Sequence, residues 1–487
     1  MSDTLRQARL DKLDKLREMG IDPYPARVPA SETIGPINER FASLENEEHS
    51  GHFITISGRL MAQRGMGKAS FFDVMDGTGK IQAYATLDKL GETYAVLSQI
   101  DVGDFVSVTG EVFRTKRGQL SIAVDEFVLL SKSIRPLPEK WHGLKDVEIR
   151  HRHRALDLIS NDDVRETFVI RSRILSTIRR TLDDTGFLEV ETPVLLSIAS
   201  GGHARPFGTH HNALDIDMCL RIALELYLKR VMIGGIDRVY EMGKCFRNEG
   251  TSTEHNPEFT MLEIYQAYTD VEGMMTLAER IITNSLQETM GKLQVEFDGK
   301  EIDFSLPWPR IGMADAVATA INVDPAALRT EEAIRLASDR GIKPAPATPG
   351  TAVNAMFDRF VEDTLIQPTF VTDYPIEISP LAKRSPKDED VVERFELFAA
   401  GMELANAFTE LNDPIDQRAR FDAQEKLREG GDEEAQRIDE DFLFALEHGM
   451  PPAGGMGMGI DRLVMLFTGS TSIRDVILFP TLRRKEA

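Results

Sequence analysis

Residues 236–269 decide the fold, and they read IDRVYEMGKCFRNEGTSTEHNPEFTMLEIYQAYT. Two runs rich in β-branched and aromatic residues flank a polar loop, residues 247–257, with no helix between them, so we predict a hairpin in a partly antiparallel sheet. Because side chains alternate along a strand, Phe259, Glu263 and Tyr265 share one face. Singly, such residues are usually surface ion pairs or structural groups. Their density on one hairpin indicates a pocket floor.

A second segment carries three carboxylates and an amide at spacings of seven, three and four: Glu396, Glu403, Asn406 and Glu410. This spacing places them near one helical face, or at inward positions of two adjacent strands. Like charges this close repel each other unless a cation intervenes, so a divalent metal or a cationic substrate is implied. An exposed acidic stripe fits poorly, because large apolar residues alternate with the acids.

A third segment, residues 454–462, reads GGMGMGIDR and predicts a glycine-rich strand that enters a helix at residues 463–467. Glycines let the backbone approach a phosphate-bearing ligand, and a cation at the helix start can bind that phosphate. The sequence contains no G-x-x-x-x-G-K-[ST] motif, and the glycine spacing is not that of a dinucleotide-binding fingerprint. ATP, if bound, is bound without a P-loop.

Composition and charge bound the class of protein. The 487 residues are 42% hydrophobic and 28% charged, and the net charge of −22 argues against a general polyanion binder. Two cysteines cannot form a disulfide framework or a four-thiolate zinc site. The N-terminus lacks the apolar core of a signal peptide, and no stretch reaches the ~20 apolar residues of a membrane span, so we predict a cytoplasmic protein with no membrane partner.

The acidic surplus is uneven along the chain. Residues 1–154 hold 22 basic and 22 acidic residues, and within them residues 132–154 hold seven basic against three acidic. Alone, that basic stretch is best interpreted as a solvated linker. We predict a helix over residues 3–19, closed by Gly20, and a strand over residues 187–196 after a helix over residues 164–185. Five short alternating runs predict a small closed β-barrel: residues 54–61, 70–75, 80–85, 105–113 and 120–129.

Together these segments resemble the signature motifs of class II aminoacyl-tRNA synthetases. Motif one matches FLEVETP at residues 187–193, motif two the Arg247 hairpin, and motif three GIDR at residues 459–462. Within the class, the sequence is similar to the lysyl-tRNA synthetases of bacterial type in four further segments: THHNAL at 209–214, ELYLKR at 225–230, HNPEFT at 255–260 and AFTELND at 407–413. The similarity covers essentially the whole chain.

The resemblance implies an α+β protein, with an N-terminal five-stranded OB-fold β-barrel followed by a class II catalytic domain on an antiparallel sheet flanked by helices. Its implied parts are an N-terminal helical extension (1–52), an anticodon-binding barrel (53–133), a linker (134–160) and the catalytic domain (161–487). The implied activity is that of an ATP-dependent lysine–tRNA ligase, which forms lysyl-adenylate and pyrophosphate and then transfers lysine to the 3′ end of tRNA(Lys). A homodimer is implied as well. The first helix either packs on its own domain or contacts tRNA.

The resemblance also implies residue roles. Arg247 and Arg462 are the expected catalytic arginines, at the α-phosphate and the γ-phosphate. ATP contacts are expected from Arg247, Glu249, His255, Phe259, Glu403 and Arg462. Up to three Mg²⁺ ions are expected against the phosphates, held by Glu396 and Glu403. The lysine contacts are expected from Gly201, Glu225, Arg247, Glu263, Tyr265, Asn406 and Glu410. Two carboxylates facing one ammonium would reject uncharged analogues more strongly than shorter ones, so ornithine is the expected competitor.

In the barrel, the resemblance implies that Phe71 stacks on an anticodon uridine while Arg64 and Gln82 read base edges. Gln119 replaces a glutamate common in the family, which weakens the assignment of that fourth anticodon contact. Other departures are Ser200, Gly202 and His203 beside the α-amino pocket, Leu224 in place of a proline, and Ala155 in place of a tyrosine.

Three alternatives stay open from the sequence. An aspartyl- or asparaginyl-tRNA synthetase shares the barrel and the motifs, but its anionic or amide substrate would require a pocket of basic or amide side chains rather than Glu225 with Glu410. A degenerate paralogue that binds RNA or a partner without catalysis would have lost Arg247 or Arg462, and both are present. Relatives that lysylate a protein lack the N-terminal barrel.

Overall fold

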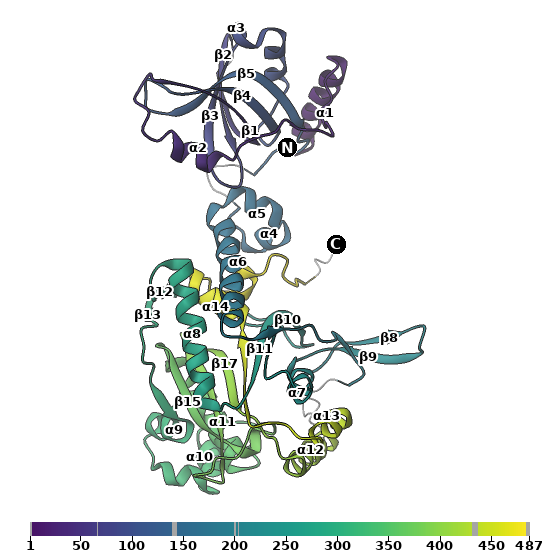
Figure 1. Ribbon diagram of the computed structural model, residues 1–487, viewed down its shortest axis with the longest axis vertical. Coiled ribbons are helices and arrows are strands. Elements are labelled where there is room, and N and C mark those ends of the chain that lie inside the picture. Colours follow the sequence, from purple (N-terminus) through teal and green to yellow (C-terminus); the bar gives the residue numbers. More distant parts are fainter. Residues whose placement is uncertain are drawn as a thin grey trace. The chain divides into compact units, whose positions relative to one another are not determined.

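The computed structural model describes residues 2–65, 67–138, 144–198, 201–202, 204–430 and 437–483. Two compact units divide the chain, residues 1–145 and residues 146–487 (Figure 1). The finer division into four segments stays a prediction.

The first unit is built on a closed barrel with strand order β1-β2-β3-β5-β4. Its strands pair antiparallel except β3 and β5, which are parallel. Alternate side chains point inwards, and Ile56, Phe72 and Val108 are among the buried ones. All five predicted strands are confirmed, each extended by one or more residues: β1 (His49–Arg64), β2 (Ala69–Met75), β3 (Lys80–Thr86), β4 (Phe105–Arg114) and β5 (Leu120–Ser131).

The first helix, α1 (Ser2–Glu18), packs on its own unit. Leu13 and Leu16 on it are buried, and Lys12 Nζ lies 2.6 Å from Asp101 Oδ1. The structure therefore favours packing over tRNA contact for this helix. The unit's remaining helices are α2 (Ile34–Arg40), α3 (Leu87–Leu90) and the 3-10 helix η1 (Gly91–Ser98).

The basic stretch is less solvated than its composition predicts. Lys132 is 0% exposed, and its Nζ lies 2.6 Å from Asp101 Oδ2 and 3.0 Å from Asp104 Oδ2. Arg154, in the second unit, is 1% exposed and forms a buried ion pair. The prediction of solvated cations is wrong for these two side chains. Carboxylates distant in the sequence neutralise Lys132, and a carboxylate one helical turn away neutralises Arg154. Residues 139–143 lie outside the described residues.

An eight-stranded sheet, in the order β14-β15-β16-β17-β18-β11-β10-β6, organises the second unit. It is antiparallel except at its two ends, where β14 pairs parallel with β15 and β6 with β10. The predicted hairpin is confirmed as β10 (Arg238–Phe246) and β11 (Glu258–Ala267). The other strands are β6 (Leu188–Glu189), β14 (Arg310–Gly312), β15 (Thr369–Pro375), β16 (Val391–Ala399), β17 (Met402–Thr409) and β18 (Ala453–Gly459).

Helices α6 (Asp162–Asp183), α8 (Val271–Met290) and α14 (Ile460–Thr468) cover one face of this sheet (Figure 1). Leu262 and Ile264 of β11 belong to the core beneath these helices. The alternate residues of β11, such as Glu263, point to the opposite face of the sheet, where α7 (Glu225–Ile233) begins. The remaining helices are α4 (Val147–Arg152), α5 (Arg154–Ser160), α9 (Met313–Ile321), α10 (Glu332–Asp339), α11 (Pro349–Phe360), α12 (Pro414–Glu429), α13 (Glu440–Leu446), α15 (Ile473–Val476), η2 (Pro325–Arg329), η3 (Glu362–Thr364) and η4 (Ile376–Ile378).

The predicted strand over residues 187–196 is wrong. Only its ends pair, as β6 and as β7 (Leu195–Leu196), and they belong to different sheets. Pro193 lies between them and has no N–H to donate to a ladder. β7 joins a three-stranded sheet with β8 (Gly208–His211) and β9 (Ile216–Leu220), and β12 (Gln294–Phe297) pairs with β13 (Lys300–Asp303).

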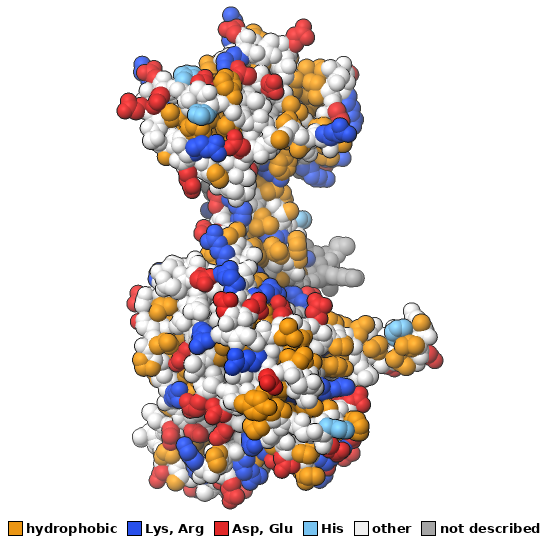
Figure 2. Space-filling model, in the orientation of Figure 1, with side chains coloured by type: hydrophobic (Ala, Val, Ile, Leu, Met, Phe, Trp, Pro, Cys, Tyr) orange, Lys and Arg blue, Asp and Glu red, His pale blue; other side chains and the backbone are white. Residues whose placement is uncertain are grey.

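The β8–β9 hairpin projects from the second unit in Figure 1, and Figure 2 shows acidic and basic side chains mixed over the visible face of each unit. Among the described residues, no helix is long and apolar enough to cross a membrane.

Candidate functional site

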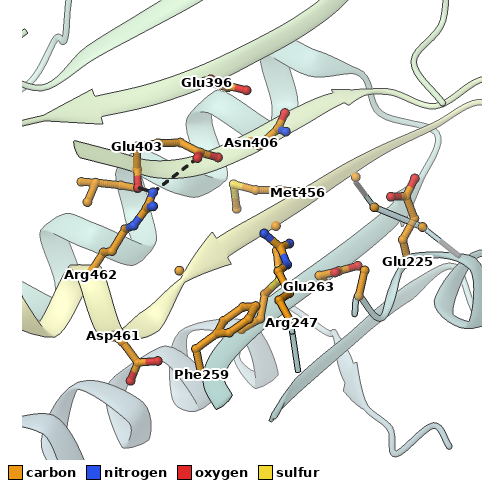
Figure 3. Close-up of a pocket in the computed structure, with 18 of the residues that line it drawn as sticks. Glu225, Arg247, Phe259, Glu263, Glu396, Glu403, Asn406, Met456, Asp461 and Arg462 are labelled. Atoms are coloured by element: carbon orange, nitrogen blue, oxygen red, sulfur yellow. Dashed lines mark hydrogen bonds and ion pairs between the residues drawn. The ribbon is translucent and has the colours of Figure 1, made fainter. Parts of the chain in front are cut away.

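A cavity of about 380 Å³ opens on the sheet face opposite α8 (Figure 3). The β10–β11 hairpin, β16, β17, β18 and the first residues of α7 and α14 form its wall. Every site residue predicted for the catalytic domain lines it except Glu410, namely Gly201, Glu225, Arg247, Glu249, His255, Phe259, Glu263, Tyr265, Glu396, Glu403, Asn406 and Arg462. The structure thus gathers residues from the three segments, together with Gly201 and Glu225, into one cavity.

Strand register explains this convergence. Asn406 on β17 pairs with Glu396 on β16 and with Gly457 on β18, and Gly457 pairs in turn with Glu263 on β11. These four residues form one row across the sheet, so their side chains point to the same face. The sequence left open whether the acidic segment forms one helical face or two adjacent strands, and the structure shows two adjacent strands.

The glycines of β18 leave space at the floor of the cavity because they have no side chains. Gly455 and Gly457 line the cavity together with Met456 (Figure 3), which also belongs to the hydrophobic core, and Met458 lies wholly in that core. A Cβ added at Gly455 would lie 2.0 Å from Glu410 Oε1. The sequence suggested that glycines here admit a phosphate, but at Gly455 the space is taken by a carboxylate.

Two arginines mark one end of the cavity, the arginine end. The Arg247 guanidinium lies 5.1 Å from the centre of the Phe259 ring, and its Nε is buried with no hydrogen-bond partner among the described residues. Arg462, in the first turn of α14, donates from Nη1 to the Glu403 carbonyl at 2.8 Å and lies 3.3 Å from Glu403 Oε2 (Figure 3). The unpartnered Nε of Arg247 and the positive N-terminus of α14 suit an anion.

The loop after β10 adds two groups at this end. Glu249 lies exposed at its rim. His255 lies 3.3 Å from Arg462 through Nε2, and its Nδ1 lies 3.0 Å from Ser252 Oγ. Burial and then the charge of Arg462 lower the pKa of His255, so the imidazole is neutral at neutral pH.

Beside Arg462, half-buried carboxylates lie close together. Glu396 accepts from Tyr374 at 2.8 Å and from Arg394 at 2.6 Å. Burial raises the pKa of Glu396 to about 7, and the nearby charge of Glu403 adds to the rise. Burial, with Glu396 and Glu403 among its neighbours, also raises the pKa of Glu362 to about 7. This repulsion is what a bound cation would relieve. Among the described residues, no group of three or more His, Cys, Asp and Glu side chains could hold a metal ion.

The other end of the cavity, the carboxylate end, holds Glu225, Glu263 and Tyr265, with Glu410 behind them. Glu263 accepts from the Leu224 amide at 3.1 Å and from the Tyr265 hydroxyl at 3.1 Å. Burial raises the pKa of Glu263 to about 7 and that of Glu410 to about 8. The carboxylate end therefore favours cationic groups, which would stabilise the ionised carboxylates.

Sequence reasoning missed two cations that position these acids. Arg394, two residues before Glu396 on the same strand face, donates from Nε to Asn406 Oδ1 at 3.1 Å. That contact leaves the Asn406 amide NH₂ free to donate into the cavity. Lys229, fully buried one helical turn after Glu225, lies between Glu225 and Glu410. The position of Arg394 could have been read from strand alternation, whereas that of Lys229 depends on long-range packing.

A third missed contact fixes the start of α14. Asp461 is buried, and its Oδ2 accepts from the Thr260 amide at 2.6 Å. Its Oδ1 lies 2.6 Å from Arg171 Nη1 on α6. Asp461 therefore ties α14 to β11 and holds the next residue, Arg462, against the cavity.

On the barrel, the predicted anticodon residues lie on neighbouring strands. Arg64 pairs with Phe71 across β1 and β2, and Gln82 on β3 accepts from Ser121 at 3.0 Å. The Phe71 ring lies 4.6 Å from that of Tyr84, an outward aromatic that sequence reasoning missed. These residues form an outer patch with exposed or half-buried side chains. Gln119 lies exposed in the turn before β5.

Of the sequence departures beside the carboxylate end, Ser200 and His203 lie outside the described residues. Gly201 is buried at φ +83°, and an added Cβ would lie 3.3 Å from Glu225 Cβ. Glycine suits this left-handed backbone next to the cavity.

Comparison with known proteins agrees with this geometry. Residues 146–483 match the family described as tRNA synthetases class II (D, K and N), and residues 54–130 match the OB-fold nucleic acid binding domain. The chain is 54% identical to the lysine–tRNA ligase of Moorella thermoacetica over 99% of this chain and 98% of that one. It is 52% identical to the lysine–tRNA ligase of Pelotomaculum thermopropionicum (99% and 95% covered) and 50% identical to that of Bacillus subtilis (98% and 97% covered).

Proposed function

The chain belongs to the class II tRNA synthetases and, among them, to the lysine–tRNA ligases, and from this membership we propose how its cavity activates lysine. It is an ATP-dependent ligase that joins lysine to tRNA. In the first step a lysine carboxylate oxygen attacks the α-phosphorus of ATP, and pyrophosphate leaves with the bonding electron pair. In the second step a hydroxyl of the terminal adenosine of tRNA attacks the lysyl carbonyl, and AMP leaves.

The carboxylate end is the lysine pocket, and its buried acids carry the proposal. Glu225 and Glu410 bind the ε-ammonium together with the Tyr265 hydroxyl, and Glu263 binds the α-ammonium near the Gly201 backbone. Buried carboxylates are costly unless paired, so a substrate with two ammonium groups suits this pocket while an aspartate or asparagine side chain does not. This distinction removes the nearest rivals within the family.

The arginine end holds ATP. Arg247 has an unpartnered buried Nε and bridges the lysine carboxylate and the α-phosphate, while Asn406 donates to the same carboxylate. Phe259 and Arg462 enclose the adenine, with Glu249 accepting from its amino group, and Arg462 and His255 hold the γ-phosphate. The in-line transition state accumulates negative charge on phosphate oxygens, which fixed guanidinium groups stabilise without reorganisation. No protein nucleophile is needed.

Glu396 and Glu403 hold Mg²⁺ when ATP binds. Their oxygen donors suit this cation, and the raised pKa of Glu396 reflects a burial and repulsion that a divalent cation offsets. Bound Mg²⁺ would supply charge neutralisation on the phosphates. Tyr374 and Arg394 orient the Glu396 carboxylate for this role.

The barrel binds the anticodon of tRNA(Lys) through Arg64, Phe71 and Gln82, with a weaker contribution from Gln119. Aromatic stacking with flanking polar groups is a common means of binding single-stranded bases. Because the chain as a whole is acidic, we expect this binding to be local and salt-dependent.

We further propose that the enzyme is a homodimer in the cytoplasm. Support for the dimer comes from β6, which is the edge strand of the large sheet and carries the exposed Leu188. An unpaired edge with an apolar side chain favours association. Sedimentation analysis tests the dimer.

The activity is tested by aminoacylation of total tRNA with labelled lysine, with Arg247→Ala as the control. We expect lysyl-tRNA from the intact enzyme and a large loss in the variant, since the variant lacks the group that bridges both substrates. Failure of the folded, intact enzyme to form lysyl-tRNA would overturn the assignment.

A further inference from the structure

Lys229 is a buried cation that contacts two acids of the lysine pocket. It lies on α7 four residues after Glu225, and its Nζ lies 2.6 Å from Glu225 Oε1 and 2.5 Å from Glu410 Oε2. The side chain is 0% exposed. Three aromatic rings surround its ammonium, those of Phe408 at 5.3 Å and of Tyr265 and Phe442 at 6.0 Å.

We propose that Lys229 is a permanent counter-cation and a positioning residue. It fixes one carboxylate oxygen each of Glu225 and Glu410, and it neutralises the pocket only in part, so that the remaining negative charge is balanced by an amino acid with two ammonium groups. The proposal rests on the lysine-activating function above. It adds a protein group to a pocket whose other members are all acids or neutral side chains.

The geometry leaves a free acceptor for the substrate. Both oxygens of Glu410 are buried without a hydrogen-bond partner that satisfies strict geometry among the described residues, but Oε2 lies in the ion pair with Lys229, which leaves Oε1 as the available acceptor. Oε1 lies 2.0 Å from the position that a Cβ on Gly455 would take, and Gly455 lines the cavity. A substrate ammonium that reaches the floor at Gly455 would therefore meet this oxygen.

The charges support the same conclusion. When all are ionised, Glu225, Glu263 and Glu410 carry three negative charges against the single positive charge of Lys229. Lysine brings two ammonium groups, which complete the balance, and its carboxylate lies at Arg247. Without lysine, Glu263 and Glu410 hold protons in part at neutral pH, since burial raises the pKa of Glu263 to about 7 and that of Glu410 to about 8.

The titratable groups around Glu410 come from two elements, Glu225 and Lys229 on α7 and Glu263 and Tyr265 on β11. Burial alone would lower the pKa of Lys229, but the two carboxylates raise it above its usual value, so this residue stays charged while its neighbours titrate. Lysine binding should therefore release protons from the carboxyls rather than from Lys229.

The test is Lys229→Met, with Lys132→Met as the matched control. Lys132 is also 0% exposed and bridges two aspartates, but it belongs to the first unit, directly after β5, and not to the unit that holds the lysine pocket. Lysine-dependent pyrophosphate exchange needs no tRNA, so it measures lysine activation without any contribution from tRNA binding. Thermal unfolding of both variants shows whether each folds, and Lys229→Arg, which keeps the charge, is the conservative variant.

We expect Lys229→Met to raise the KM for lysine by about tenfold or more, since it leaves two buried carboxylates uncompensated, and to leave the KM for ATP unchanged. The pH at which kcat/KM for lysine reaches half its maximum should move upward, and Lys229→Arg should restore part of the affinity. Lys132→Met should lose thermal stability but keep the wild-type KM for lysine. A Lys229→Met enzyme with wild-type KM and pH profile would overturn the proposal while leaving the ligase function intact.

A second measurement does not depend on the variant's folding. Calorimetric titration of the wild-type enzyme with lysine at pH 7, in two buffers of different ionisation enthalpy, counts the protons exchanged. We expect net proton release. Binding without a proton change would overturn the charge balance, and the absence of any lysine binding or exchange in the wild type would overturn the ligase function with it.

Discussion

Gly455→Ala tests the shape of the lysine pocket with a single methyl group. In the structure the added Cβ would lie 2.0 Å from Glu410 Oε1 and 2.5 Å from Tyr265 Cε1. The backbone at Gly455 is an ordinary strand conformation, so the variant strains contacts rather than dihedral angles. Relief requires Glu410 or Tyr265 to move away from the substrate.

The size of the effect follows from that movement. Real Cβ contacts below 3.0 Å are essentially absent, so the Glu410 oxygen must retreat by about 1 Å, and a misplacement of about 1 Å in a positioned group costs about 100-fold in rate. Overpacking of a buried position costs about 1–3 kcal/mol, or about 5- to 150-fold. We therefore expect kcat/KM for lysine to fall by about 10- to 100-fold, while KM for ATP stays within about twofold because the arginine end is untouched.

Gly454→Ala is the matched control, because it puts the same methyl group on the opposite face of β18. Its Cβ would lie 2.8 Å from the Asp270 carbonyl and 2.9 Å from Met274 Cγ, beneath α8. We expect this variant to unfold at lower temperature but to bind lysine normally. Pyrophosphate exchange with varied lysine and with varied ATP measures both variants. The reasoning is refuted if Gly455→Ala keeps the wild-type KM and kcat for lysine, or if both variants lose lysine affinity equally.

Three further outcomes follow from the same site. The pKa values of about 7 for Glu263 and about 8 for Glu410 mean that both carboxyls bind protons below these values, so kcat/KM for lysine should rise with pH across 6 to 8.5; a flat pH profile would contradict this. Arg394→Gln removes the charged hydrogen bond to Asn406, and loss of about 1.5–3 kcal/mol predicts a fall of roughly 10- to 150-fold in kcat/KM for lysine in pyrophosphate exchange. Unchanged kinetics would remove Arg394 from the site. Phe71→Ala should weaken tRNA binding in aminoacylation by about 1–3 kcal/mol of stacking and leave pyrophosphate exchange unaltered, and an equal loss in both assays would argue against an anticodon role.

The sequence predicted most elements because local patterns carry them. Alternating apolar residues indicated the barrel and the β10–β11 hairpin, and side-chain alternation along β11 is enough to place Glu263 and Tyr265 on one face. The failure at residues 187–196 also has a local cause, since Pro193 interrupts pairing. It shows that an apolar run predicts burial better than it predicts continuous pairing.

What the sequence could not predict depends on register and on contacts between distant segments. The need for glycine at position 455 follows only from the position of β18 between β11 and β17, which brings Tyr265 and Glu410 against it. Lys229 looks like an ordinary helix-surface lysine until α7 packs on the sheet and buries it. Charge complementarity within the pocket is therefore a property of the fold rather than of any one motif.

The central claim is that paired buried carboxylates select the amino acid by its charge. The most direct measurement is pyrophosphate exchange with lysine, ornithine and norleucine compared by kcat/KM. We predict that ornithine, shorter by one methylene, loses only about 1–3 kcal/mol, whereas norleucine, which leaves the carboxylates of Glu225 and Glu410 unpaired, is rejected far more strongly. Activation of norleucine as efficient as that of ornithine would contradict the claim.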